Sequence, residues 1–242
     1  MTNPWAILDL DRGAPYVLEC DVAGLADAET LCARKSSEFA RRHRYRTNLY
    51  PDPFTGRPDA PIMVFTLNPG YTDEARAERW RSKGCTGSDD WWHENSAAMR
   101  ECYKANLQHK AQQFPMFFLD PRLRGSPGSV YYRQQFGALI GRYGEHRVSR
   151  NICVVEYFPY HSEGFADVVR VPSQSYSLHL VRQGIQRAAC IVVLRKVREL
   201  LSAVPELADY AVVTANSKQN ATVSPGNIRR FEDLCRVIED GR

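Results

Sequence analysis

The strongest constraint on the fold is a set of four short apolar runs, separated by segments with a helical pattern. The runs are residues 62–67 (IMVFTL), 152–157 (ICVVEY), 190–194 (CIVVL) and 210–214 (YAVVT). Each is rich in valine or isoleucine and nearly continuous, which is typical of strands buried on both faces of a parallel sheet. Strands that alternate with helices favour an α/β domain. We therefore predict a three-layer α/β/α fold with a central, mainly parallel four-stranded sheet.

Apolar spacing also predicts the helices between and after these runs. We expect helical structure over residues 91–113, 130–143, 177–189, 196–207 (interrupted by Pro205) and 228–239. A further helix is predicted over residues 25–43, and it ends in a basic stretch at residues 40–46 (ARRHRYR). These cations either interact favourably with the C-terminal end of the helix dipole or contact phosphate. We expect residues 1–50 to form a helical extension packed on the core, and residues 51–242 to form a single α/β domain.

Composition narrows the class of protein. With 242 residues and 43% hydrophobic content, the chain can bury one good-sized core. Its net charge of +4 permits a polyanionic partner without requiring one. The seven cysteines include no C-x-x-C pair, which favours a reducing cytoplasm over a disulfide framework, a zinc site or an iron–sulfur site. The first residues lack a signal-peptide pattern, and no apolar run reaches membrane-spanning length, so we expect a cytoplasmic protein without a membrane partner.

Polar groups follow three of the four apolar runs. The first run is followed by Asn68-Pro69-Gly70-Tyr71, and the second ends in Glu156 and leads into residues 157–162 (YFPYHS). The last leads into Asn216 and a long loop. Because ligands of an open parallel sheet bind beyond the carboxyl ends of its strands, we predict one shared site at this edge. The alternative is that turn propensity alone places these residues there.

Two of these segments carry a resemblance to a known family. Leu67-Asn68-Pro69-Gly70 follows a buried strand, and Asn216-Ser217 with Ser224-Pro225-Gly226-Asn227 follows the last strand. The arrangement, over roughly residues 61–239, resembles the uracil-DNA glycosylase superfamily, in its mismatch- and thymine-acting branch. The resemblance implies a DNA glycosylase-like hydrolase, without cofactor or metal, that cleaves the N-glycosidic bond of uracil or another altered or mismatched base after base flipping.

The resemblance also implies roles for individual residues. Asn68 would hold a water against the sugar carbon, and Gly70, beside Tyr71, would form the pocket wall where a bulkier residue would exclude a thymine methyl group. Asn216 would contact the leaving base or its phosphate. Backbone amides from Ser224 to Asn227 could cradle a phosphate.

The chain departs from the family pattern at two places. Its second motif (NSKQNATVSPGN) is longer than the compact family loop, and Glu156 stands near where family members often place a base-reading asparagine. Glu156 either pairs with a cation or, facing the pocket, is a candidate acid or base with a raised pKa. His161 is either an ordinary loop histidine or a donor to the leaving base. Phe158 is either a core aromatic or a stacking surface for the base.

Two other functions stay open at this point. One is a divergent member of the same fold that binds a nucleotide or nucleic acid without cleaving it. The other is an unrelated α/β hydrolase or transferase that uses Glu156, His161 and Ser162. The chain lacks G-x-S-x-G, P-loop and G-x-G-x-x-G motifs, so we rank this last. The sequence makes no prediction of oligomeric state.

Overall fold

The computed structural model describes residues 1–166, 170–195, 197–217 and 222–240, and within them a five-stranded mixed sheet. The strand order is β1-β3-β2-β4-β5. The strands are β1 Phe54–Thr55, β2 Ile62–Thr66, β3 Ile152–Glu156, β4 Cys190–Val193 and β5 Val213–Thr214. The last four lie in the predicted apolar runs and pair in parallel, whereas β1 is antiparallel to β3. The α/β class is confirmed, and the sheet has five strands, the four predicted parallel ones and the added antiparallel strand β1.

The added strand β1 lies in a proline-rich loop, where two residues give no recognisable strand pattern. Beyond its ends, the amide of Glu156 donates to the carbonyl of Pro53 at 3.0 Å, and the amide of Asp52 donates to the carbonyl of Pro159 at 2.8 Å. These bonds hold Asp52 beside the carboxyl end of β3. The register between β2 and β3 then sets Thr66 directly opposite Glu156 at the same edge.

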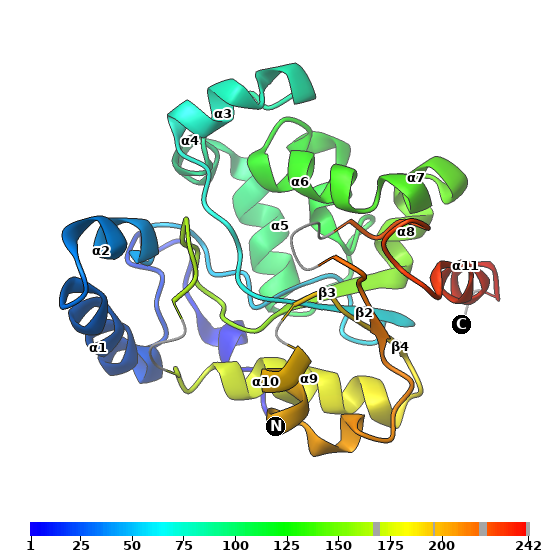
Figure 1. Cartoon of the computed structure of the whole chain (residues 1–242). Coiled ribbons are helices and arrows are strands. Elements are labelled where there is room, and N and C mark those ends of the chain that lie inside the picture. The colour runs from blue at the N-terminus through cyan, green and yellow to red at the C-terminus, as the bar shows by residue number, and fades with distance from the viewer. Residues whose placement is uncertain (167–169, 196, 218–221, 241–242) are drawn as a thin grey trace.

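Helices lie on both faces of the sheet (Figure 1). Helix α9 packs against β3 and β4 on one face, while α5, α6 and α8 lie on the other (Figure 1). The α-helices are α1 Val22–Ala33, α2 Ser37–His43, α3 Glu74–Arg79, α4 Asp89–Asn95, α5 Ala97–Leu107, α6 Pro127–Gln135, α7 Gly137–Tyr143, α8 Glu145–Asn151, α9 Gln174–Gln186, α10 Val197–Ala203 and α11 Phe231–Asp240. Short 3-10 helices span Pro4–Ile7, Glu19–Asp21, Arg81–Lys83, Phe117–Leu119, Pro121–Leu123 and Pro205–Leu207.

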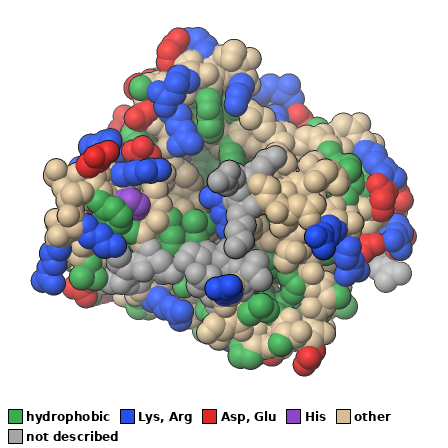
Figure 2. All heavy atoms as spheres, viewed as in Figure 1, with side chains coloured by type: hydrophobic (Ala, Val, Ile, Leu, Met, Phe, Trp, Pro, Cys, Tyr) green, Lys and Arg blue, Asp and Glu red, His purple; other side chains and the backbone are tan. Residues whose placement is uncertain are grey.

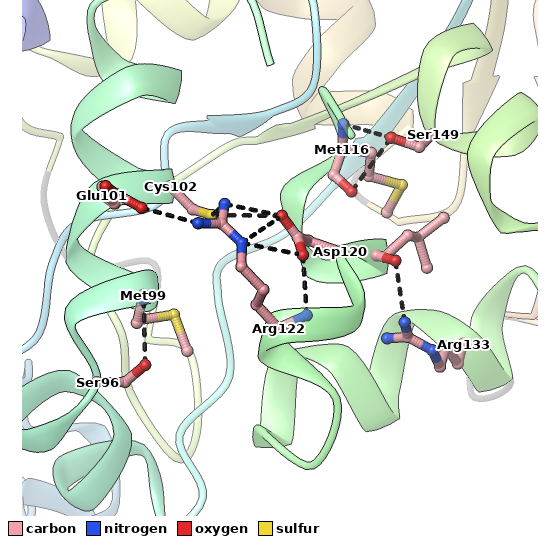
Figure 3. Close-up of polar contacts among 10 residues, drawn as sticks. Ser96, Met99, Glu101, Cys102, Met116, Asp120, Arg122, Arg133 and Ser149 are labelled. Carbon is pink, nitrogen blue, oxygen red and sulfur yellow. Dashed lines mark hydrogen bonds and ion pairs between the residues drawn. The ribbon is translucent and has the colours of Figure 1, made fainter. Parts of the chain in front are cut away.

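Three of the predicted helical segments each contain two helices. The segment 25–43 is split between α1 and α2, the segment 91–113 between α4 and α5, and the segment 130–143 between α6 and α7. Serine caps explain two of the breaks. The hydroxyl of Ser36 accepts from the amide of Phe39 at 3.0 Å, and that of Ser96 accepts from the amide of Met99 at 3.2 Å (Figure 3). Each satisfies an amide at a helix start, so a new helix begins with a change of direction.

The N-terminal fifty residues are built into the same core as the sheet. Trp5, Leu10, Leu25 and Tyr45 are buried in one hydrophobic cluster with the central strands. The buried hydroxyl of Tyr160, in the loop after β3, donates to Asp21 at 2.7 Å. The N-terminal segment therefore supports the loop that follows the second central strand.

The segment between α5 and α6 lies on the opposite face of the sheet from α9 and is held in place by ion pairs. The guanidinium of Arg122 contacts the carboxylates of Asp120 and Glu101, both at distances near 3 Å (Figure 3). Asp120 is buried, so this pair is better shielded than an exposed one. The adjoining turn carries Phe118, which becomes a wall of the cavity described below. Within the described residues, no helix combines the length and apolar character needed to cross a membrane.

Candidate functional site at the carboxyl ends of the central strands

A cavity of about 380 Å³ lies beyond the carboxyl ends of β2, β3 and β4. This size is typical of small-molecule sites. Five of the residues predicted from the sequence line it: Asn68, Gly70, Tyr71, Glu156 and His161. Figure 2 shows a hollow on this face, with Lys and Arg side chains around it and hydrophobic side chains within. The ends of the central strands β2, β3 and β4 therefore meet at one site, as expected from the sequence.

Asn68 follows β2 directly, and its side-chain amide has a defined orientation. Its Nδ2 donates to the carbonyl of Pro69 at 2.9 Å and to the hydroxyl of Ser162 at 3.0 Å. The Ser162 hydroxyl donates its own proton to the carbonyl of Gly164 at 3.0 Å, so it can only accept from Asn68. The amide nitrogen must therefore face these two acceptors. Among the described residues, Oδ1 of Asn68 has no hydrogen-bond donor, and it is available to a water or ligand.

Glu156 ends β3 and is buried at the cavity wall, 4% exposed. Its carboxyl accepts from the hydroxyl of Thr66, its neighbour across the strand pair, and from that of Tyr132 at 3.4 Å. Burial raises its pKa to about 8, because removing the carboxylate from water outweighs these two hydrogen bonds. Glu156 therefore exchanges its proton near neutral pH, and no ion pair with a described residue holds it charged.

Gly70 and Tyr71 form the turn that leads away from Asn68. A Cβ atom added at Gly70 would meet no atom within 4 Å, so packing within the chain does not require glycine there. Tyr71 is fixed by its hydroxyl, which donates to Asp90 at 2.5 Å, and by the guanidinium of Arg46, 4.0 Å from its ring centroid. The turn thus presents an open position beside a fixed aromatic ring.

His161 lines the cavity, but the backbone engages both of its ring nitrogens. Nδ1 lies 2.7 Å from the carbonyl of Gly70, and Nε2 lies 3.1 Å from that of Tyr50. Burial lowers the pKa of His161 to about 4, since desolvation of the imidazolium exceeds the help from these carbonyls. The imidazole is therefore neutral at pH 7 and carries one N–H, so it donates to only one of these two carbonyls at a time while packing between the turn at Gly70 and the loop at Tyr50.

Four predicted residues lie outside the cavity lining. Phe158 is fully buried and stacks on Tyr45, with ring centroids 4.7 Å apart, as a core aromatic. In the loop after β5, Asn216 accepts from Arg229 at 3.0 Å, and Asn227 donates to the carbonyl of Thr222 at 2.9 Å. The hydroxyl of Ser224 lies 3.4 Å from that of Thr222. Part of the predicted second motif, residues 218–221, lies outside the described residues.

Sequence reasoning missed several residues of the cavity. Asp52 and Asp89 are buried there, and burial raises the pKa of each to about 7. The hydroxyl of Thr55 donates to Asp52 at 2.6 Å, and the amide of Thr72 donates to Asp89 at 2.7 Å. Tyr103 and a wall of further aromatic residues are also in the lining. None of them follows an apolar run, so the rule that found Asn68 and Glu156 had no reason to select them.

Three arginines line the cavity, and in the described part of the chain they form no ion pairs with its buried carboxyls. Arg42 of α2, Arg76 of α3 and Arg195 after β4 are lining residues. Arg76 donates to the carbonyl of Tyr71 at 3.1 Å and lies over the ring of Trp80. Among the described residues, none of the three arginines forms an ion pair with Asp52, Asp89 or Glu156.

The described part of the chain contains no group of three or more His, Cys, Asp or Glu side chains placed to hold a metal ion. The cavity lining brings together an amide, carboxyls, hydroxyls, guanidinium groups and aromatic rings. No family model, no curated protein and no solved structure matches the chain.

Proposed function

We propose that this protein is a DNA glycosylase-like hydrolase, which cleaves the N-glycosidic bond of an altered or mismatched base flipped into the cavity. The observation that carries the proposal is the orientation of Asn68. Its amide nitrogen is held by Pro69 and Ser162, and its oxygen is left to accept a hydrogen bond from a water. This is the arrangement needed to aim a water at a sugar carbon from the end of a central strand.

The reaction follows from that geometry. The water oxygen bonds to C1′ of the sugar and loses a proton to solvent, the C–N bond breaks, and its electron pair passes to the base nitrogen, which takes a proton from solvent. An amide orients the water but takes no proton from it, so the rate depends on how well the base leaves. A base in the cavity would lie among Phe118, Tyr131 and Tyr132, with the carboxyl of Glu156 within its reach.

The arginines at the cavity suit a nucleic acid as the carrier of that base. Arg42, Arg76 and Arg195 come from three separate elements and line the cavity, where phosphates flanking a flipped nucleotide would pass. His161 is given a positioning role in this proposal, because its ring nitrogens face Gly70 and Tyr50.

One observation favours a second function, binding without cleavage. The described residues of the loop after β5, including Asn216, Ser224 and Asn227, do not line the cavity. The contact to the leaving base that the family resemblance implies is therefore not made by these residues. A divergent binder would keep the pocket and the salt-dependent affinity and would release no base.

Base release decides between the two. Labelled oligonucleotides with uracil, hypoxanthine, xanthine, a G·U pair or a G·T pair are incubated with the protein and with Asn68→Ala. Release by the native chain that is lost in the variant supports the hydrolase. Salt-dependent binding with no abasic product from any oligonucleotide supports the binder. Absence of both release and binding, in a folded protein at low salt, overturns both functions.

A further inference from the structure

Three buried carboxyls share the cavity, and they come from three separate parts of the chain. Asp52 precedes β1, Asp89 begins α4 and Glu156 ends β3. They are 2%, 7% and 4% exposed, and none forms an ion pair within the described residues. Buried carboxylates are normally paired with cations, because an isolated charge is costly away from water. This set therefore lacks the partner that would complete it.

A second observation points to a ligand at the same place. Tyr103, on α5, lines the cavity and is fully buried, and its hydroxyl has no hydrogen-bond partner among the described residues. Desolvation and the nearby Asp52 and Asp89 raise its pKa well above the ordinary value. Most buried hydroxyls are hydrogen-bonded, so an unpaired one at a cavity marks a position where a bound group would be satisfied. We name Asp52, Asp89, Tyr103 and Glu156 the acidic recess.

The walls around the acidic recess are aromatic. Tyr131 and Tyr132 of α6, Phe118 before it and Trp80 directly after α3 line the cavity. Aromatic faces attract cations, most strongly where water is excluded. Carboxyls and ring faces therefore favour the same kind of ligand.

The acidic recess is also able to change its charge. Burial raises the pKa of Asp52 and Asp89 to about 7 and that of Glu156 to about 8, so little free energy is needed to ionise them near neutral pH. The charged and titratable groups lining the cavity are Arg42, Asp52, Tyr71, Arg76, Asp89, Tyr103, Tyr131, Tyr132, Glu156, His161, Glu163 and Arg195. The neutral form suits an empty cavity, and a cation entering it would release protons.

We propose that the altered base taken by the cavity is one that carries a positive charge, such as a ring-N-alkylated purine, held by the carboxylates of the acidic recess and the faces of the tyrosines. This rests on the proposed function. A cationic base also suits a site that only orients water. When the C–N bond breaks, its electron pair neutralises the base cation, so no proton donor to the leaving group is needed. The proton lost from the water passes to solvent.

The test compares two bases that differ in charge but have the same methyl group and nearly the same outline. Single-stranded oligonucleotides carry either 1-methyladenine, cationic at neutral pH, or 1-methylhypoxanthine, which is neutral. Affinity is measured by fluorescence anisotropy at pH 6, 7 and 8. We expect the cationic base to bind about tenfold tighter at pH 8, with the preference growing from pH 6 because binding requires ionised carboxyls. Equal affinities, or a preference for the neutral base at all three pH values, would overturn the proposal.

Variants assign the preference to the acidic recess. Asp52→Asn and Glu156→Gln retain side-chain shape and cannot ionise, and each is expected to remove most of the pH-dependent preference. Asp59→Asn is the matched control, because Asp59 is exposed, pairs with Arg57 and lies outside the cavity lining. Thermal unfolding of each variant confirms that it is folded. A preference unchanged in both recess variants would also overturn the proposal.

The two proposals fail in different ways. Base release is measured from the same oligonucleotides and from ones with 7-methylguanine, uracil or hypoxanthine. Release of uracil or hypoxanthine with no charge preference in binding rejects the cationic base and keeps the hydrolase. A charge preference in binding with no release from any oligonucleotide keeps the acidic recess and rejects the hydrolase.

Discussion

The loops after the central strands differ from the loop after β5, although one rule predicted a site in all of them. Asn68 and Glu156, at the ends of β2 and β3, lie at a cavity with fixed side-chain partners. Asn216, after β5, is exposed and bonds to its own loop and to Arg229. Strand β5 is a two-residue strand at the end of the sheet order, and among the described residues it has a neighbouring strand on one side only. A polar strand end becomes a site where neighbouring elements enclose it.

The largest expected effect comes from comparing the two asparagines. Asn68→Ala removes the group that orients the water, and we expect base release to fall by about 100-fold or more. Asn216→Ala removes an exposed side chain, so the free energy of unfolding of this variant should differ from that of the native chain by less than about 0.5 kcal/mol. Single-turnover release from the best oligonucleotide of the panel measures the first effect, and thermal unfolding measures the second. An equal loss of base release in both variants would show that Asn216 contributes to the reaction as much as Asn68 does.

The pH dependence of the free energy of unfolding tests whether Glu156 is buried at the end of β3. The pKa of Glu156 is about 8 in the folded chain and about 4.3 when unfolded, so its favourable contribution is complete at low pH and is lost as the pH rises towards 8. Glu156→Gln does not titrate. We expect its stability relative to the native chain to rise by up to about 1.4 kcal/mol per pH unit between pH 5 and 8.

Urea unfolding at several pH values measures this difference. Glu206→Gln is the control, since Glu206 is exposed beside Arg182 and should show little such trend. A flat difference between Glu156→Gln and the native chain over this range would mean that Glu156 is solvated and charged in the folded protein.

A smaller effect is expected at Ser162, which holds the amide of Asn68. Ser162→Ala leaves Asn68 tied only to the carbonyl of Pro69, so the amide is less often in the productive orientation. We expect kcat for base release to fall about tenfold with KM little changed. Ser224→Ala, in the loop after β5, is the matched control. A rise in KM at constant kcat would instead indicate that Ser162 binds substrate.

The smallest effect is expected inside the loop after β5. Asn227 is buried, donates to the carbonyl of Thr222 and accepts from the amide of Ser217 at 2.9 Å. Asn227→Ala should lower stability by about 1–2 kcal/mol and leave base release unchanged. Urea unfolding and the release assay together test this. Lost release with normal stability would show that this loop does reach the substrate.

Much of the fold was predictable because it depends on local patterns. The four apolar runs give β2, β3, β4 and β5, since a continuous Val/Ile run is stable where both faces of a strand are covered. Asn68 and Glu156 were found from their position at strand ends. Helix lengths were less predictable. Ser96 looks like any polar residue within a helical pattern, yet its hydroxyl caps a new helix.

The rest of the site was out of reach because it depends on long-range contacts. Asp52 follows no strand, and it reaches the cavity because β1 pairs antiparallel with β3. Asp89 and Tyr103 come from helices α4 and α5, whose surfaces could as well have faced solvent. The roles of His161 and Phe158 were decided in the same way, by the backbone carbonyls and the aromatic ring that packing brought to them.

By itself, then, the sequence determined the α/β class, the four parallel strands and the amide that follows the first of them. These depend on hydrophobic periodicity and on the few residues next to each strand, which interact over short distances along the chain. Tertiary structure alone decided which strand ends are enclosed, which carboxyls lose their water and which hydroxyl is left unpaired. Those properties depend on burial, and burial is set by elements that are distant in sequence and adjacent only after folding.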